Sequence, residues 1–215
     1  MPPGEKGAGR LYGLPKIHKG IPAGKNIPKC RPIVSQSGSN TEGISKYVDS
    51  HAKELMRRIE SYVEDTPDML RQFEHSNSQG SLPENAIPIT VDVQSLYTSI
   101  PADGSTGGMQ AFETALNTRD NKTVPTWFLM ELLKNTLYGN IFEFNDQLYI
   151  QRIGTAMGTR VAPTYACLFM SWLEGEILKS WQGTKPLLFR RYIDDVFMVW
   201  NGSVEELERF LHHHL

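Results

Sequence analysis

The sequence predicts an α+β fold in one mixed domain of 215 residues. Two short runs, 87–97 and 190–200, are rich in β-branched and aromatic residues and read as strands. Between Ile44 and Ile59, apolar residues recur every three or four positions, as on one face of a helix. Segments of both kinds alternate along the chain without an internal repeat or a low-complexity linker, which favours a single core.

Composition excludes several classes of protein. The chain has 40% hydrophobic and 21% charged residues, as an ordinary globular protein does, and its net charge of −2 rules out a uniformly basic nucleic-acid binder. Two cysteines, Cys30 and Cys167, are too few for a disulfide framework or a zinc site, which indicates a reducing compartment. Because no apolar stretch approaches the roughly 20 residues of a membrane span, and residues 1–10 lack the apolar core of a signal peptide, we expect an intracellular protein without membrane contact.

The first elements, within residues 1–40, are expected to be extended segments and turns, because prolines and glycines interrupt them. Positive charge gathers in the first 31 residues, where seven lysines and arginines accompany one glutamate. A solvated tail is one explanation, but the interleaved apolar residues favour a folded segment that directs its cations at a target. These cations are Lys6, Arg10, Lys16, Lys19, Lys25, Lys29 and Arg31.

The middle of the chain predicts a series of helices. Pro67 should end the first helix and begin the second, with Thr66 as its cap, and 75–85 is expected to be a polar loop. Near the C-terminus, Ser203 and Glu206 have the spacing of a capping box, which predicts a final helix. The other expected helices span 44–59, 109–116, 125–138 and 164–178, and the expected hairpin joins 141–144 to 147–151 around Asn145-Asp146.

Candidate functional residues lie in the two strand-like runs. Asp194 and Asp195 fall between two apolar segments, which predicts a strand, a tight turn carrying both acids, and a strand. Such acids can be a solvated turn and nothing more. The other run contains Asp92 between Val91 and Val93, and a carboxylate held against apolar surroundings is costly to ionise unless a cation compensates it. Side by side, the two segments would form a site for hard divalent cations, which prefer oxygen ligands.

Three further features accompany these acids in a fixed order. Tyr97 follows Asp92 by five residues, and the glycine-containing stretch 152–166 lies between the acidic segments. The N-terminal region contains Leu-Tyr-Gly-Leu-Pro-Lys-Ile-His-Lys at 11–19 and Arg-Pro-Ile-Val-Ser at 31–35. As a set, and over most of the chain, these blocks resemble the reverse transcriptases of Penelope-like retroelements, which are similar to the telomerase catalytic subunit.

The resemblance implies a right-hand polymerase with fingers and palm, in which an antiparallel palm sheet packs on helices. The fingers would comprise about 1–85 and 105–150, and the palm about 86–104 and 151–215. Because the chain ends shortly after Asp195, we expect the thumb, the remainder of the palm and any endonuclease domain to be absent from it.

The resemblance also assigns roles to single residues. Asp92 and Asp194 would hold two Mg²⁺ ions, for which Mn²⁺ could substitute, with Asp195 as the third acid of the palm. Two such ions, roughly 3.5 to 4 Å apart, activate a primer 3′-hydroxyl and stabilise the departing pyrophosphate. Nucleotide contacts are expected from Lys16, Arg31, Tyr97, Met157 and Gly158, and template or primer contacts from Lys19, Gly154, Arg160 and Tyr192.

Several of these residues have a structural alternative. Arg31 suits bidentate phosphate contacts and Lys16 a point contact, although either could form a structural salt bridge. Tyr97 could be a core aromatic or the floor under the nucleotide sugar, where its ring would exclude a 2′-hydroxyl. The glycines suit a loop whose backbone approaches a base pair closely, or a turn that merely enters a helix. Met157 stands where many reverse transcriptases have glutamine, which removes a polar contact but not the role of the backbone.

The sequence therefore favours an RNA-directed DNA polymerase module in the nucleus, acting on an RNA or DNA template, a DNA primer and deoxynucleoside triphosphates. A catalytically silent remnant that binds nucleic acid or a protein is the alternative. An unrelated metal-dependent phosphohydrolase would need acids and histidines clustered differently. The run His212-His213-His214 is not expected to bind metal, because three consecutive helical residues cannot share one face.

Overall fold

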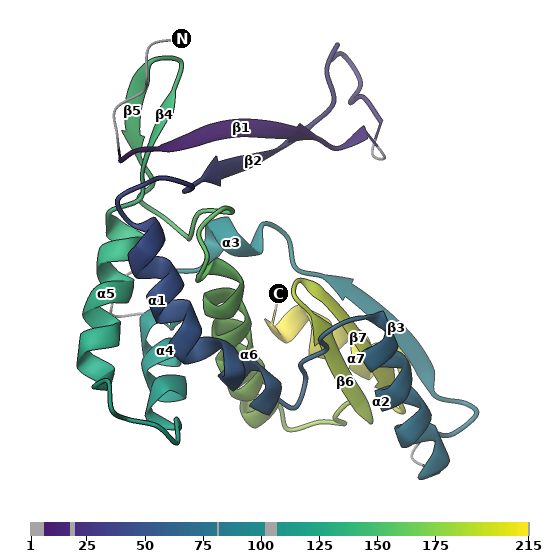
Figure 1. Ribbon diagram of the computed structural model, residues 1–215. Helices are drawn as coiled ribbons and strands as arrows, with labels where there is room; N and C mark the ends of the chain where they lie inside the picture. The colour runs from purple at the N-terminus through teal and green to yellow at the C-terminus, as the bar shows by residue number, and fades with distance from the viewer. Residues whose placement is uncertain (1–6, 18–19, 81, 102–106, 215) are drawn as a thin grey trace.

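The computed structural model describes residues 7–17, 20–80, 82–101 and 107–214, and it contains two β-sheets joined to a helical body (Figure 1). The strands are β1 (Gly9–Pro15), β2 (Cys30–Ser35), β3 (Ile87–Asp92), β4 (Ile141–Phe144), β5 (Gln147–Ile150), β6 (Leu188–Tyr192) and β7 (Asp195–Trp200). The helices are α1 (Glu42–Ala52), the 3₁₀ helix η2 (Lys53–Arg58), α2 (Thr66–Ser78), α3 (Leu96–Ser99), α4 (Gly108–Asn117), α5 (Thr126–Tyr138), α6 (Ala162–Ser180) and α7 (Val204–His214).

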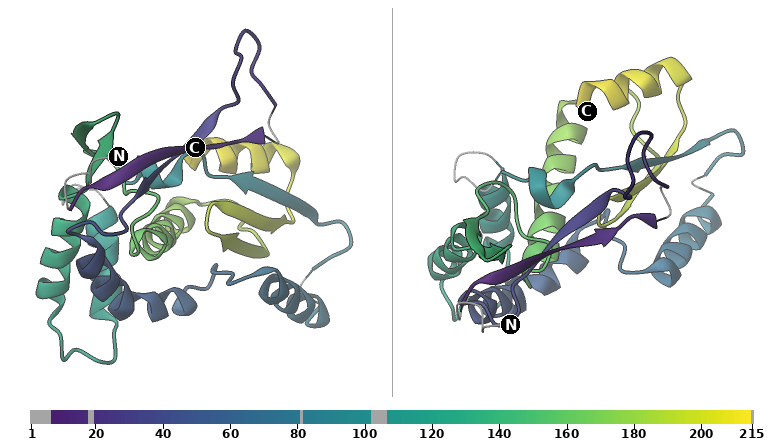
Figure 2. Two further views of the ribbon diagram at one scale, coloured as in Figure 1. Left: turned by 45° about the horizontal axis from the view of Figure 1, so that its top comes forward. Right: turned by 90° about the horizontal axis from the view of Figure 1, so that it is seen from above.

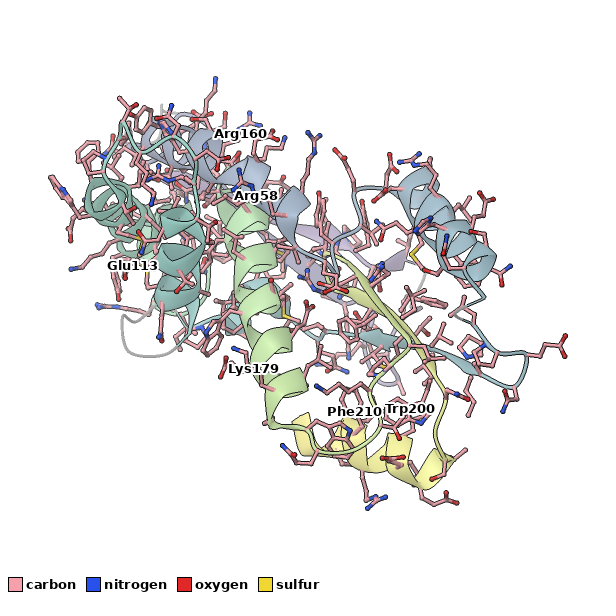
Figure 3. The ribbon with its side chains drawn as sticks, turned by 90° about the horizontal axis from the view of Figure 1, so that it is seen from below. Arg58, Glu113, Arg160, Lys179, Trp200 and Phe210 are labelled. Carbon is pink, nitrogen blue, oxygen red and sulfur yellow. The ribbon has the colours of Figure 1, made fainter. Side chains whose placement is uncertain are left out.

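The smaller sheet is antiparallel, with strand order β3-β7-β6. Its apolar side chains pack with α6 and α7 into one hydrophobic cluster. Trp200, fully buried at the end of β7, lies against the ring of Phe210 on α7 with the two ring centroids 5.4 Å apart (Figure 3). The two helices therefore cover one face of this sheet. The expected antiparallel sheet packed on helices is confirmed.

The larger sheet, of order β2-β1-β4-β5, extends away from the helices (Figures 1 and 2). β1 and β2 are antiparallel, whereas β1 pairs with β4 in parallel through Gly9 and Arg10. The predicted β4–β5 hairpin is confirmed, and Asn145 and Asp146 in its turn have φ angles of 51° and 60°. Positive φ at both loop residues is the requirement of a type I′ turn, which asparagine and aspartate meet easily.

A buried polar network fastens the larger sheet to the helical body. The side-chain amide of Gln36, just after β2, donates to the side chain of Asn140, which follows α5. Asn140 in turn donates to the side chain of Gln151 after β5 at 3.0 Å. The segments that follow the two edge strands, β2 and β5, are thus joined through Asn140, and the buried polar groups satisfy one another's hydrogen bonds.

The helical body surrounds a second hydrophobic cluster. α1, α4, α5 and α6 contribute fully buried side chains that include Phe112, Leu129, Leu133 and Tyr165. The helices expected around 109–116, 125–138 and 164–178 are confirmed, because each follows an apolar stripe that this cluster covers. No helix in the described ranges combines the length and apolarity that crossing a membrane requires.

Three local expectations are corrected. The segment 44–59 begins its helix earlier, at Glu42, and narrows to the 3₁₀ form from Lys53. The cap of α2 is Asp65 rather than Thr66, since the Asp65 carboxylate accepts the Asp68 N–H at 2.8 Å. Because α2 continues to Ser78, the start of the expected 75–85 loop is helical.

The capping box of α7 forms only in part. The Ser203 hydroxyl accepts the Glu206 N–H at 3.2 Å, as predicted. The Glu206 carboxylate does not return to Ser203, however. It accepts the N–H and the hydroxyl of Thr184 at 2.7 and 2.8 Å, and so anchors the loop that follows α6.

We expect Phe210→Ala to destabilise the fold by about 3 kcal/mol, because it empties a site buried between Trp181 and Trp200. Val204→Ala, at the exposed start of the same helix, should change stability by less than about 0.5 kcal/mol. Urea unfolding of both variants tests this difference. Equal stabilities would show that α7 does not depend on this aromatic contact.

Candidate active site

The register of the smaller sheet brings the two acidic segments together. Asp92 at the end of β3 is the cross-strand partner of Asp195 at the start of β7, and Tyr192 of β6 is the next partner in the same row. The Val93 N–H donates to the Asp194 carbonyl at 2.9 Å, which continues the ladder by one residue. Because cross-strand partners share a face, Asp92, Asp195 and Tyr192 form one row at the sheet end where β6 turns into β7.

This row lies on the face of the sheet opposite α6 and α7. Burial alternates along β3, with Val91 half-buried and Asp92 exposed, and Asp195 is also exposed. The expectation that apolar neighbours surround Asp92 is wrong, because successive strand residues point to opposite faces. Asp92 is therefore an accessible carboxylate with the core behind it.

The donor chemistry of the three acids fits a divalent cation, for which carboxylate oxygens are preferred ligands. None of the three carboxylates has an ion-pair or hydrogen-bond partner within the described part of the chain. Across the described ranges, no three His, Cys, Asp or Glu side chains lie close enough together to hold a metal ion. The backbone thus places the acids side by side, while a closed three-ligand cluster is not preformed in the described side chains.

The turn that carries Asp194 has an unusual backbone. Ile193 and Asp194 form a two-residue loop between the partners Tyr192 and Asp195, and Ile193 has a φ of 56°. A β-branched residue rarely adopts positive φ, which costs of order 1–3 kcal/mol and persists only where the surroundings impose it. The tight turn was predicted from the sequence, but with both acids in it, whereas Asp195 begins β7; the strain at Ile193 was not predicted.

Beneath the turn, a buried ion pair joins β6 to α6. Arg191, with no exposed surface, contacts the carboxylate of Glu174, which is itself buried. The Ser61 hydroxyl donates to the same carboxylate at 2.6 Å. Sequence reasoning missed this cluster, because the three residues are scattered along the chain. The available signal was Glu174, which with Glu176 is one of two acids in the otherwise largely apolar stretch 164–178.

The glycine-containing loop before α6 packs against both the α3 segment and β2. A Cβ on Gly154, which has a φ of 71°, would lie 2.4 Å from the Tyr97 carbonyl oxygen. One on Gly158 would lie 2.2 Å from the carbonyl oxygen of Val34. The Thr155 N–H also donates to the Tyr97 carbonyl at 2.6 Å. Both glycines are therefore required by a close approach to protein backbone, and the expected approach of this loop to a base pair stays a prediction.

Tyr97 lies between the acidic turn and the helical core, and its phenol has a raised pKa. It lies on α3 rather than on a strand, half-buried at the edge of the helical core. Burial raises the pKa of its phenol to about 12, and Asp194 adds to this rise while Arg31 of β2 opposes it.

The remaining candidates are accessible. Neither Lys16 nor Arg31 forms an ion pair or a side-chain hydrogen bond within the described residues, so the salt-bridge alternative finds no support there. Arg160 is exposed, and Tyr192 is 47% exposed beside Asp195. Met157 is half-buried in the glycine-containing loop, and Lys19 lies outside the described residues.

An apolar cavity lies on the other side of the sheet. It has a volume of about 260 Å³, and Val91, Met198, Phe210 and Ile177 contribute to its lining. None of the three carboxylates borders it. The candidate site is therefore the exposed rim of the sheet and not the cavity.

The sheet with acids at its β6–β7 turn, together with a second sheet that bears unpaired cations, has the architecture of the fingers and palm of a nucleic-acid polymerase. The chain belongs to the family described as reverse transcriptase (RNA-dependent DNA polymerase), which matches residues 24–215. No curated protein matches the sequence.

Solved structures share this fold at low sequence identity. Apo telomerase from Candida tropicalis is similar with a TM-score of 0.70 and 10% identity, over 99% of this chain and 41% of the telomerase. Telomerase from Candida albicans, in complex with a fragment of telomeric RNA, gives 0.66 and 12%, over 95% and 38%. The RNA-dependent RNA polymerase of a human picobirnavirus gives 0.59 and 12%, over 97% and 38%. The chain spans less than half the length of each.

We expect Gly158→Ala to destabilise the fold by about 1–3 kcal/mol, because the added methyl group must displace β2. Gly175→Ala is the matched control, since a Cβ there meets no atom within 4 Å, and it should stabilise α6 by about 0.5–1 kcal/mol. Urea unfolding measures both. A Gly158→Ala protein as stable as the parent would contradict the packing described for the loop.

The Tyr97 phenol predicts a loss of stability at high pH. Its folded-state pKa lies above the ordinary value of 10.0, so the folded protein keeps a proton that the unfolded chain releases. The stabilisation is complete below pH 10.0 and is lost as the pH rises towards about 12. Between about pH 9.5 and 11.5, a range within which the unfolded chain releases this proton first, the free energy of unfolding of the parent should therefore fall more steeply than that of Tyr97→Phe. Parallel curves would contradict the raised pKa.

Proposed function

We propose that this chain is the fingers–palm module of an RNA-directed DNA polymerase of the Penelope-like type, which adds deoxynucleotides to a primer 3′-hydroxyl. The observation that carries the proposal is the register that sets Asp92 opposite Asp195 and beside Asp194, in a chain of the reverse transcriptase family. Phosphoryl transfer requires mainly positioning and charge neutralisation, and both can be supplied from this rim.

In this proposal, residues of the smaller sheet bind the cations, and residues in or next to the larger sheet bind the triphosphate. Asp92 and Asp194 hold two divalent cations, with Asp195 assisting. These ions, when bound, lower the pKa of the primer hydroxyl and neutralise the charge of the leaving pyrophosphate. Arg31 and Lys16 bind the triphosphate, which is supported by the absence of an ion-pair partner for either residue within the described ranges. Tyr97 forms the floor beneath the sugar.

Primer extension with Mg²⁺, an RNA template and a DNA primer tests the proposal. Asp194→Asn should reduce the rate roughly 100-fold or more, as the loss of one preorganised charge in an active site does. Asp146→Asn is the matched control, because it makes the same change in the turn of the other hairpin, and it should leave the rate unaltered.

If the parent and Asp194→Asn both fail to extend the primer while nucleic acid still binds, the proposal is wrong. The chain would then be a silent binding module with the same fold.

We expect Tyr97→Val to admit ribonucleotides, because the smaller side chain leaves room for a 2′-hydroxyl. Tyr97→Phe keeps the ring and should retain the preference of the parent for deoxynucleotides. Competition between dGTP and GTP in primer extension measures the preference. Unchanged discrimination in Tyr97→Val would show that Tyr97 is a core residue only.

A further inference from the structure

We propose that Arg191 is a positioning residue for the turn that carries Asp194, acting through the carbonyl group of Ile193. The inference rests on the proposed function, since the aim of this turn matters for catalysis only if Asp194 takes part in it. Arg191 itself is buried on the face of the sheet that lies against α6, and so it does not reach substrate.

The guanidinium of Arg191 connects the turn to α6. Its Nη1 donates to the Ile193 carbonyl oxygen at 3.0 Å. Its Nη2 donates to the carbonyl oxygen of Cys167 at 3.2 Å, and its Nε donates to the Glu174 carboxylate. One planar cation thus bonds the residue before Asp194 to two residues that lie about two turns apart on α6, a geometry that lysine cannot reproduce.

The anchor of this bridge is itself fixed. The Ser61 hydroxyl donates to Glu174 at 2.6 Å, which leaves the buried carboxylate with two partners. The backbone of Arg191 also pairs with the segment after η2. Its N–H donates to the Ser61 carbonyl at 2.6 Å, and its own carbonyl accepts the Val63 N–H at 3.0 Å. Arg191 is therefore fixed through its side chain and its backbone, independently of its hydrogen bond to the turn.

The turn needs such a restraint. Ile193 has a φ of 56°, a conformation that a β-branched residue leaves when it is free to do so. A relaxation at Ile193 would move the next residue, Asp194, whose carbonyl accepts the Val93 N–H and so aligns the turn with β3. Hydrogen bonds from a charged donor are about twice as strong as neutral ones, which suits Arg191 to hold the strained carbonyl.

A purely structural ion pair is the competing explanation. A buried pair can be replaced by neutral side chains with little loss of stability, whereas removal of one partner leaves a costly unpaired charge. Replacement of both partners therefore separates the two roles. Arg191→Met combined with Glu174→Gln keeps a neutral, filled core and the acceptor of Ser61, but it removes the donor to Ile193.

The matched control is Arg119→Met. Arg119 is also buried, and its nitrogens donate to Leu116, Val124 and Thr126 near the α4–α5 connection, with no contact to the turn. The readouts are the melting temperature, kcat and the Mg²⁺ dependence of primer extension, and the hydrogen-exchange rate of the Val93 amide measured by NMR. The last reports on the bond to Asp194 and does not require activity.

We expect the double variant to melt no lower than Arg119→Met. Its kcat should fall roughly tenfold or more, with a higher Mg²⁺ requirement, and its Val93 amide should exchange roughly tenfold faster or more, as the loss of a charge-assisted bond implies. Arg119→Met should keep the parent values of kcat and Val93 exchange. A double variant with parent kcat and parent Val93 exchange would overturn the proposal.

Two other outcomes are also decisive. If the double variant does not fold, Arg191→Lys preserves the buried charge but cannot serve the carboxylate and both carbonyls together. Faster Val93 exchange in that variant supports the proposal, and an unchanged rate overturns it. If the parent chain does not extend a primer, the proposed function fails separately, and Val93 exchange in the double variant alone decides whether Arg191 positions the turn.

Discussion

The hydrogen-bonded register between β3 and β7 is the constraint on which the candidate site depends. It sets Asp92 opposite Asp195, and it extends by one bond from the Val93 N–H to the Asp194 carbonyl. A slip of one residue would turn Asp92 towards α6 and bring Val91 to the opposite face of the sheet. The register is fixed because Ile87, Ile89 and Val91 must face the hydrophobic cluster that α6 and α7 complete. Burial of apolar side chains thus determines where the carboxylates lie.

The two faces of the β3-β7-β6 sheet carry different kinds of charged residues. The face opposite α6 and α7 is partly covered by α2 through Phe73 and Phe197, and its exposed end presents the acids and Tyr192 without a charged partner in the described part of the chain. The covered face holds Arg191 and Glu174, whose mutual contact and further hydrogen bonds satisfy both charges. The unpaired carboxylates thus lie where solvent or an ion can reach them. The Arg191–Glu174 pair lies in the core, where it supports the backbone of the turn. The strained turn at Ile193 lies where these two faces meet.

The second sheet reaches the same site through backbone contacts. The loop that contains Gly154 and Gly158 touches the Tyr97 carbonyl on one side and the Val34 carbonyl on the other. Arg31 lies on the same strand as Val34, and its charge partly offsets the rise in the pKa of the Tyr97 phenol that burial causes. The loop therefore joins β2 of the larger sheet to α3, which follows β3, and leaves no room for a side chain at either glycine.

The sequence predicted what local patterns encode. Apolar spacing located α4, α5 and α6, and the Asn145-Asp146 pair located the β4–β5 turn. The acids stood out because a resemblance to reverse transcriptases joined two weak signals. The exposure of Asp92, the contacts of the glycines and the Arg191–Glu174 pair were not predicted, because each depends on which face or which distant segment a residue meets. Periodicity within one element carries no information on such contacts.

The central claim is that the paired ends of β3 and β7 hold two ions for nucleotide addition. Anomalous diffraction from crystals of the chain with Mn²⁺, a primer–template and a non-hydrolysable deoxynucleotide would test it most directly. The account predicts two manganese peaks, roughly 3.5 to 4 Å apart, bound by Asp92 and Asp194, and neither peak in Asp92→Asn. Ordered nucleotide with no manganese at these carboxylates, or manganese that remains in Asp92→Asn, would contradict it.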